Sequence, residues 1–161
     1  MRLDLSGPGC APASRTETMK LTMEAELAVR ASLCLAEEYG RGLVPLAEIC
    51  RRRKLKRDYL AKICRKLVQA NLVDAVRGKA GGYRLSRPPE EITLLDVIEA
   101  VEGRLALNLC QYHPPKCGDL DCPVRPVWED LQEKVRSALA GKTLAELIWA
   151  HGGPGAGDPG G

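Results

Sequence analysis

The chain has 161 residues, of which 28% are charged and 45% hydrophobic, with a formal net charge of +3 and seven cysteines. This length suits one domain with a small appendage, and the net charge alone is too small to indicate nucleic-acid binding. Without a run of roughly 18 apolar residues or a secretory signal, we expect a cytoplasmic protein whose odd number of cysteines stays reduced.

The first predicted element is a helix that follows a polar N-terminal extension. Residues 1–18 show no periodic apolar pattern and are predicted to be disordered, together with Cys10. Met19 offers a second translation start. From Thr22 to Tyr39 apolar side chains recur at three- and four-residue steps, which predicts a helix with a wide buried face.

The next two predicted helices concentrate basic residues. A short helix from Pro45 through Arg53, a turn at 54–56 and a helix from Arg57 to Ala70 have the outline of a helix-turn-helix. Between Arg51 and Lys66, nine of sixteen residues are basic and one is acidic. Such a run is usually a solvated face, but its confinement to the turn and second helix of this motif favours nucleic-acid binding.

A β-hairpin is predicted directly after the helix-turn-helix. Its strands are Leu72–Arg77 and Tyr83–Ser86, and the five-residue turn between them, Gly78–Gly82, is rich in glycine. A hairpin in this place is a wing. Positive charge lies along it at Arg77, Lys79, Arg84 and Arg87.

The helix-turn-helix and its wing yield a set of candidate DNA contacts. The N-terminus of a recognition helix enters the major groove first, so the candidates to reach base edges, with a preference for guanine, are Lys56, Arg57, Tyr59 and Lys62. The candidates to hold phosphates are Arg51, Arg52, Arg53, Lys54, Arg65 and Lys66. On the wing, Arg77 and Lys79 are placed to enter a minor groove.

Three more helices are predicted after the wing. The capping-box pair Thr93 and Asp96 begins a helix that runs through Val101, and Thr143 begins a last helix that ends at Ala150. Between them lies an a/d seam of two heptads with a polar opposite face, formed by Val124, Trp128, Leu131, Val135 and Ala138. So little chain remains to cover this seam that we expect it to form a homodimer interface.

The segment from Cys110 to Cys122 holds three cysteines among proline, glycine and aspartate residues. Thiols this close together on irregular backbone are typical ligands of a metal centre, either an iron–sulfur cluster or zinc, although they can also be redox thiols. A structural zinc site usually shows two C-x₂₋₄-C pairs, and only the interval from Cys117 to Cys122 comes near that spacing. Three other cysteines occupy inward helical positions and are excluded from the site, namely Cys34, Cys50 and Cys64.

Several segments, in this order, resemble the Rrf-type transcriptional regulators, the family that includes the cluster-sensing repressors IscR, NsrR and RirA. They are Met19–Thr22, Asp58–Leu60, the wing Val76–Leu85, Glu91–Ile98 and the three-cysteine loop, and the similarity spans Met19 to Trp149. The resemblance implies a homodimeric winged-helix protein that binds double-stranded DNA at a palindromic operator. It also implies an iron–sulfur cluster, with 2Fe-2S favoured over 4Fe-4S, bound by Cys110, Cys117 and Cys122.

The chain departs from the family pattern in two ways. Six and four residues separate the cysteines instead of five and five, and Arg125 stands where some members have a histidine ligand. Arginine cannot lose its proton to coordinate iron. In other members the fourth ligand is an acidic residue near the start of the first helix of the partner subunit, which makes Glu26 the preferred fourth ligand here. Glu24 and His113 are weaker candidates, and a solvated Glu26 favoured by the helix dipole is the alternative.

The predicted fold is mainly α with a small β-hairpin wing, that is, a winged helix-turn-helix plus a C-terminal dimerisation helix. The expected divisions are a disordered extension (1–18), a DNA-binding domain (19–103), a cysteine loop (104–123), the dimerisation and final helices (124–150) and a disordered tail (151–161). The expected function is transcription regulation that senses redox, iron or nitric oxide status through the cluster. The alternatives are a cluster-free regulator that senses a metabolite or thiol oxidation and, further off, an electron-transfer protein. No enzyme motif is present.

Overall fold

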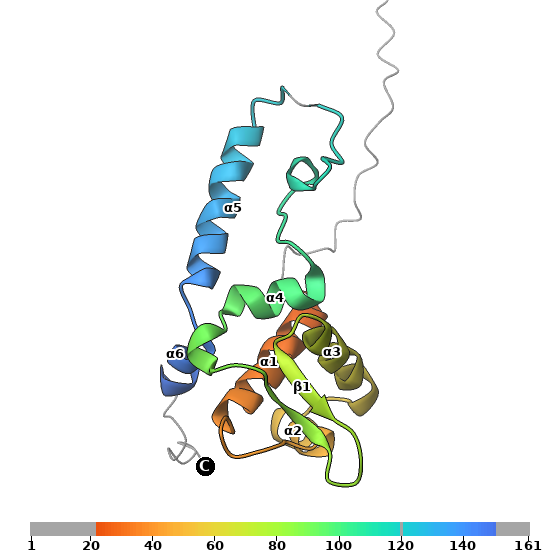
Figure 1. The fold of residues 1–161 in the computed structure, drawn as a ribbon. Helices are drawn as coiled ribbons and strands as arrows, with labels where there is room; N and C mark the ends of the chain where they lie inside the picture. The colour runs from red at the N-terminus through yellow and green to blue at the C-terminus, as the bar shows by residue number, and fades with distance from the viewer. Residues whose placement is uncertain (1–21, 120, 151–161) are drawn as a thin grey trace, which may run out of the picture.

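The computed structural model describes residues 22–119 and 121–150, so the predicted extension and tail, with Cys10 and Met19, lie outside the described residues. Figure 1 shows a group of packed helices with a two-stranded hairpin, from which one long helix stands apart. The helices and strands are α1 (Met23–Glu37), α2 (Leu46–Arg53), α3 (Arg57–Gln69), β1 (Val73–Val76), β2 (Gly82–Leu85), η1 (Pro89–Glu91), α4 (Leu94–Glu102), η2 (Leu109–Gln111), α5 (Arg125–Ala140) and α6 (Leu144–Ala150). The mainly α fold with a small hairpin is therefore confirmed.

Helix α1 is the centre of the core. It packs against α2, α3, α4, α6 and β2. The small side chains on its buried face allow these elements to approach closely. Ala25, Ala28, Ala31 and Cys34 are completely buried. Thr22 caps the helix by accepting a hydrogen bond from the Ala25 amide. The predicted wide apolar face is confirmed.

The helix-turn-helix is formed by α2, α3 and the turn between them. Pro45 has extended backbone and caps α2 instead of belonging to it. The helix therefore begins at Leu46, one residue later than predicted. Lys54 ends α2 with a left-handed backbone, φ 54°, which turns the chain sharply toward α3. The apolar side of α3 is buried at Leu60, Ile63, Leu67 and Cys64, the last of which was predicted to face inward.

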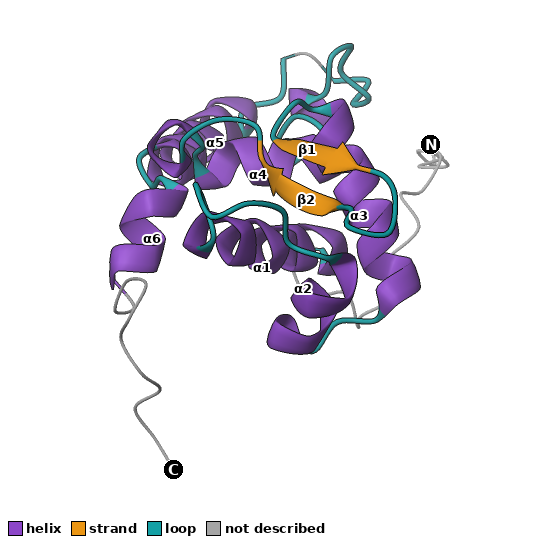
Figure 2. Cartoon of the chain, turned by 60° about the horizontal axis from the view of Figure 1, so that its bottom comes forward, coloured by secondary structure: helices purple, strands orange, loops and turns teal. Residues whose placement is uncertain are grey.

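The wing is an antiparallel pair in which Val73 faces Leu85 and Val76 faces Gly82. The first strand is shorter than predicted, whereas β2 has the predicted length but begins one residue earlier, so that Gly82 belongs to β2 rather than to the turn. Tyr83 also pairs with Val44, exchanging backbone hydrogen bonds of 2.8 and 2.9 Å, so the segment before α2 is joined to the hairpin. A side chain at Gly82 would meet the Val44 carbonyl oxygen at 2.6 Å, which explains the glycine. Figure 2 shows the hairpin beside α3 and α1.

The last three helices differ in how they contact the domain. The predicted capping box of α4 is present, with Thr93 and Asp96 bonded reciprocally, and the buried side chains of this helix are Leu95, Val97, Ile98 and Val101. Helix α6 returns to the core through Leu144. Helix α5, by contrast, has no buried residue. No described helix combines the length and apolar composition that crossing a membrane requires.

Candidate DNA-binding surface and cysteine loop

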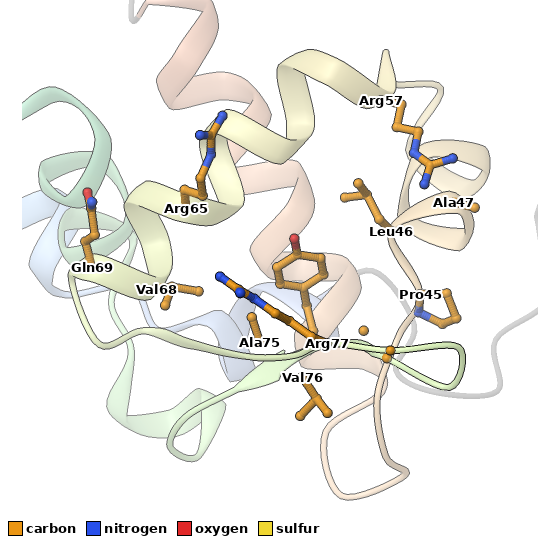
Figure 3. A pocket seen from close by; sticks show the side chains of 14 residues that line it. Pro45, Leu46, Ala47, Arg57, Arg65, Val68, Gln69, Ala75, Val76 and Arg77 are labelled. Atoms are coloured by element: carbon orange, nitrogen blue, oxygen red, sulfur yellow. The ribbon is translucent and has the colours of Figure 1, made fainter.

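A groove of about 680 Å³ lies between α3, the start of α2 and the wing. Figure 3 shows the guanidinium groups of Arg57 and Arg65 reaching from α3, and Arg77 reaching from the end of β1. Apolar groups also line the groove, among them Leu46, Val68 and Tyr83. The arrangement brings three cations, far apart in sequence, to one concave face.

The exposed cations of α3, of the turn before it and of the wing turn form no ion pair with a carboxylate of the described residues. Among the described residues, no carboxylate lies within ion-pair distance of Lys54, Lys56, Arg57, Lys62, Arg65, Arg77 or Lys79. Seven unpaired cations on one helix, its preceding turn and the wing create a positive potential that suits a polyanion. Tyr59 differs from them, because it is partly buried and packs against the core.

The arginines of α2 are instead engaged in ion pairs inside the chain. Arg51 binds Glu48 through two hydrogen bonds of 2.6 and 2.9 Å. Arg52 binds Glu48 and Glu38, each at 2.7 Å, and Arg53 pairs with Glu37. Hydrogen bonds from Arg51 and Arg52 lower the pKa of Glu48 to about 2. The structure thus connects these predicted phosphate ligands to each other and to the end of α1.

Lys66 lies on a different side of α3 from the groove. Its ammonium group pairs with Glu24 of α1 and donates a 2.9 Å hydrogen bond to the Val101 carbonyl of α4. These partners belong to the domain itself. Lys66 therefore joins α3 to the beginning of α1 and the end of α4, a role that the sequence did not indicate.

The cysteine loop connects α4 to α5. Cys110 lies in the short helix η2 and is 8% exposed, whereas Cys117 and Cys122 are partly exposed, and all three thiols are free. Within residues 22–119 and 121–150, no group of three or more His, Cys, Asp or Glu side chains is arranged to hold one metal ion. The structure thus places the three predicted sulfur ligands on one loop without gathering them around a single point.

The helical cysteines lie inside the domain, as predicted. Cys34 and Cys64 are fully buried, and Cys50 is partly buried against the core. Burial raises the pKa of Cys64 to about 12 and also raises the pKa of Cys34. Since the thiolate is the form that binds metals, these two protonated thiols are unsuited to be ligands.

The candidates for a fourth ligand lie at different places. Glu26, in the first turn of α1, is about half exposed and pairs with Arg30 one turn later. Glu24 is engaged by Lys66, and His113 is exposed in the cysteine loop. Arg125 donates a 3.0 Å hydrogen bond to Glu129. Of these side chains, Glu26 and His113 are the most exposed.

The loop is joined to the neighbouring helices by side chains that the sequence reasoning missed. Glu99 of α4 accepts a 2.9 Å hydrogen bond from the Leu105 amide and also pairs with Arg136 of α5. Gln111 bonds to the loop backbone and to α5. A signal for Gln111 was present, since Asn108-x-x-Gln111 has the spacing of a capping box. The partners of Glu99 carried no such local signal.

Fold and surface together define a winged helix-turn-helix DNA-binding protein, and comparison with known proteins agrees. The Rrf2 profile, described as an iron-dependent transcriptional regulator, matches residues 21–150. The chain therefore belongs to the Rrf2 family of transcriptional regulators, which are not enzymes.

Individual relatives show how far the similarity extends. The HTH-type transcriptional regulator IscR of Aliivibrio salmonicida is 38% identical over 130 residues, which cover 81% of this chain and 77% of that protein. The solved structure of T. potens IscR is 28% identical with a TM-score of 0.69, covering 87% of this chain and 93% of that one. CymR, the global cysteine regulator of B. subtilis, is 27% identical with a TM-score of 0.70, covering 83% and 98%.

The ion pairs around Glu48 generate a prediction about pH. The pKa of Glu48 is lowered from 4.5 to about 2, so its contribution to stability is present above pH 4.5 and is lost as pH falls toward 2. Glu48→Gln should lower the thermal unfolding midpoint at neutral pH, and the difference from wild type should shrink across that acidic range. Thermal unfolding followed by circular dichroism at a series of pH values measures both curves.

A suitable control is Asp130→Asn, which removes an exposed i,i+4 pair with Lys134 on α5. Such surface pairs contribute little, so its midpoint should follow wild type at each pH. Parallel curves for wild type and Glu48→Gln from neutral pH to pH 2 would contradict the role given to Glu48.

Proposed function

We propose that this regulator is a homodimer that binds a palindromic operator and senses redox, iron or nitric oxide status through an iron–sulfur cluster on Cys110, Cys117 and Cys122. The observation that carries the proposal is the position of three free thiols on the segment that joins the DNA-binding domain to the unburied helix α5. A change in this segment acts on both the DNA-binding domain and the helix that we assign to the dimer. The similarity to IscR supports the same function.

The donor set fits an iron–sulfur cluster. Cysteine thiolates are the usual cluster ligands, and these three lie within thirteen residues of one loop. Glu26 of the partner subunit is our choice for the fourth ligand, because it is exposed and carries a carboxylate. When bound, the cluster supplies a centre that oxidants, nitric oxide or iron shortage can alter. A centre with three thiolates and one oxygen is held less tightly than one with four thiolates, which suits a sensor.

Helix α5 is the proposed dimer contact. Along the predicted seam, Trp128 and Val135 are partly buried, while Val124, Leu131 and Ala138 are exposed. Val127 beside them is 62% exposed and Leu131 is 37% exposed. An apolar strip of this kind on a helix without buried residues requires a cover, and a second copy of the same strip supplies one.

Substitution of Leu131 tests the dimer. Leu131→Asp places a charge in the middle of the proposed strip, so the protein should change from dimer to monomer. Sedimentation velocity measures the mass, and circular dichroism verifies that the helices remain. Glu133→Ala, on the polar side of the same helix, should stay dimeric. A dimer that persists in Leu131→Asp would exclude this face.

For DNA, we assign the base edges to the start of α3 and the backbone to the rest of the unpaired surface. Lys56, Arg57 and Lys62 are exposed at or near the N-terminus of the recognition helix, with Tyr59 beside them. Arg65 and the wing residues Arg77 and Lys79 are placed to contact phosphates and the minor groove. The ion-paired Arg51, Arg52 and Arg53 keep α2 in place, and any phosphate that they contact has to compete with Glu48, Glu38 and Glu37.

Arg65 and Lys66 are neighbours on α3, but the first faces the groove and the second is bound within the domain. Arg65 faces the groove without an acidic partner among the described residues, whereas Lys66 is bound to Glu24 and Val101. Each lost phosphate contact lowers the slope of log affinity against log salt by roughly 0.9. A dimer of Arg65→Met should therefore lose roughly two units of slope, while Lys66→Met should keep the wild-type slope. Fluorescence anisotropy with operator DNA between 50 and 200 mM salt measures both slopes.

Lys66→Met serves as the matched control in that experiment, because it also removes one positive charge from the same helix. Its expected defect is a lower midpoint in urea unfolding, since the Val101 carbonyl and Glu24 lose their partner. If Lys66→Met lowered the slope of log affinity against log salt and Arg65→Met kept the wild-type slope, the assigned faces of α3 would be reversed.

The cluster itself is tested by anaerobic purification. The protein should be brown and contain iron and sulfide, Cys117→Ala should lose the colour, and Cys50→Ala should keep it because Cys50 packs against the core. Operator affinity at fixed salt should differ between the cluster-containing and the cluster-free wild-type protein. A colourless, iron-free wild-type sample, or equal affinities, would refute the proposed sensing mechanism.

The second candidate function is a cluster-free regulator that senses a metabolite or thiol oxidation. The structural likeness to CymR, a cysteine regulator, favours it. So does a hollow of about 370 Å³ at the junction of α4, the loop and α5, lined mainly by apolar residues such as Ile98, Leu107 and Val135. A colourless dimer that binds DNA in the experiment above would support this function.

A further inference from the structure

The residue after the first loop cysteine is a buried amide. Gln111 is 7% exposed, and among the described residues it is one of only two buried polar or charged ones, together with Ser32. Most glutamines stay at the surface because burying an amide without partners costs free energy. A glutamine that is buried beside a proposed cluster ligand therefore requires hydrogen-bond partners, and its burial requires an explanation.

The partners of Gln111 come from both sides of the loop. Its side-chain oxygen accepts hydrogen bonds from the amides of Leu107 and Asn108, at 2.9 and 3.0 Å. Its side-chain nitrogen donates to the carbonyl of Trp128 in α5. One side chain thus satisfies two loop amides and connects the Cys110 segment to the proposed dimer helix.

The connection is local to Cys110. The short helix η2 holds Cys110 and Gln111 in consecutive positions, and Asn108 caps this helix by accepting from the Leu109 amide at 2.7 Å. Cys117 and Cys122 come later in the loop and are more exposed than Cys110. The three thiols therefore differ in burial, and η2, the short helix that carries Cys110, packs against α5.

We propose that Gln111 is a positioning residue for Cys110, and this inference rests on the proposed function of the loop. The amide of Gln111 keeps Cys110 in place on α5 whether or not a cluster is bound. Cluster assembly then needs to order only the later part of the loop, around Cys117 and Cys122. A bound cluster would be held in that later part by Cys117 and Cys122, while the hydrogen bond from Gln111 to the Trp128 carbonyl would connect the Cys110 segment to α5 with or without it.

Thiol reactivity in the metal-free protein tests this inference without any cluster. In wild type, N-ethylmaleimide should modify Cys110 more slowly than Cys117 and Cys122, as measured residue by residue with mass spectrometry. Gln111→Leu removes all three hydrogen bonds, so the Cys110 rate should rise on the order of tenfold, while buried Cys34 and Cys64 stay protected. Gln132→Leu is the matched control. It removes a longer, 3.4 Å hydrogen bond to the same Leu107 amide, so its Cys110 rate should stay within about twofold of wild type.

A second variant covers the case in which Gln111→Leu unfolds and exposes Cys34 and Cys64. Gln111→Glu keeps an acceptor for the Leu107 and Asn108 amides but loses the donor to Trp128. Its Cys110 rate should lie above wild type, and its core cysteines should stay unmodified. Equal Cys110 rates in wild type and Gln111→Glu would overturn the inference.

The cluster-loaded protein gives an independent readout. An iron chelator should strip iron from Gln111→Leu, or from Gln111→Glu if the leucine variant unfolds, on the order of tenfold faster than from wild type and Gln132→Leu. If wild type takes up no iron, the proposed function fails, yet the alkylation rates still decide whether Gln111 holds Cys110. If wild type is loaded and the Gln111 variants show unchanged alkylation and iron loss, only the positioning role fails.

Discussion

The structure depends on how closely other elements can approach α1. Its buried positions are mostly alanines with Cys34 and Leu35, so α2, α3, α4 and α6 all reach its backbone. Small side chains allow this approach but give each contact little apolar area, and larger residues of the surrounding helices, such as Ile63 and Leu67, supply the rest. The positions of the recognition helix and of the helix that leads to the cysteine loop are thus set by the same central helix.

The basic residues of this domain fall into two groups, those that form ion pairs within the chain and those that do not. The basic run that continues from α2 into α3 is uniform in sequence, but its first part is neutralised by Glu37, Glu38 and Glu48, whereas most of its second part has no carboxylate partner among residues 22–119 and 121–150. Paired arginines stabilise the packing of α2 on α1. Unpaired ones remain available for phosphates, because an anion that binds them displaces water and counterions rather than a protein carboxylate. The surface of unpaired positive charge is therefore smaller than the number of basic residues suggests.

Much of the fold could be predicted because its signals are local. Periodicity located the helices, the capping boxes located two helix starts, and glycines located the wing. Interactions between distant residues could not be predicted in this way. Lys66 looks like its basic neighbours until Glu24, 42 residues away, is placed beside it. The candidate site divides in the same manner, since spacing identifies the three cysteines, whereas the bonds of Gln111 and Glu99 that join their loop to α5 and α4 are not visible in the spacing.

The last turn of α4 is where these distant interactions meet. Glu99 binds the loop at Leu105 and α5 at Arg136. Two residues further, the Val101 carbonyl accepts a hydrogen bond from Lys66 of the recognition helix, and the next residue, Glu102, accepts one from Thr22 at the start of α1. Each of these bonds joins a different element to residues 99–102, so the cysteine loop, α5, the recognition helix and the start of α1 share one anchoring segment at the end of α4.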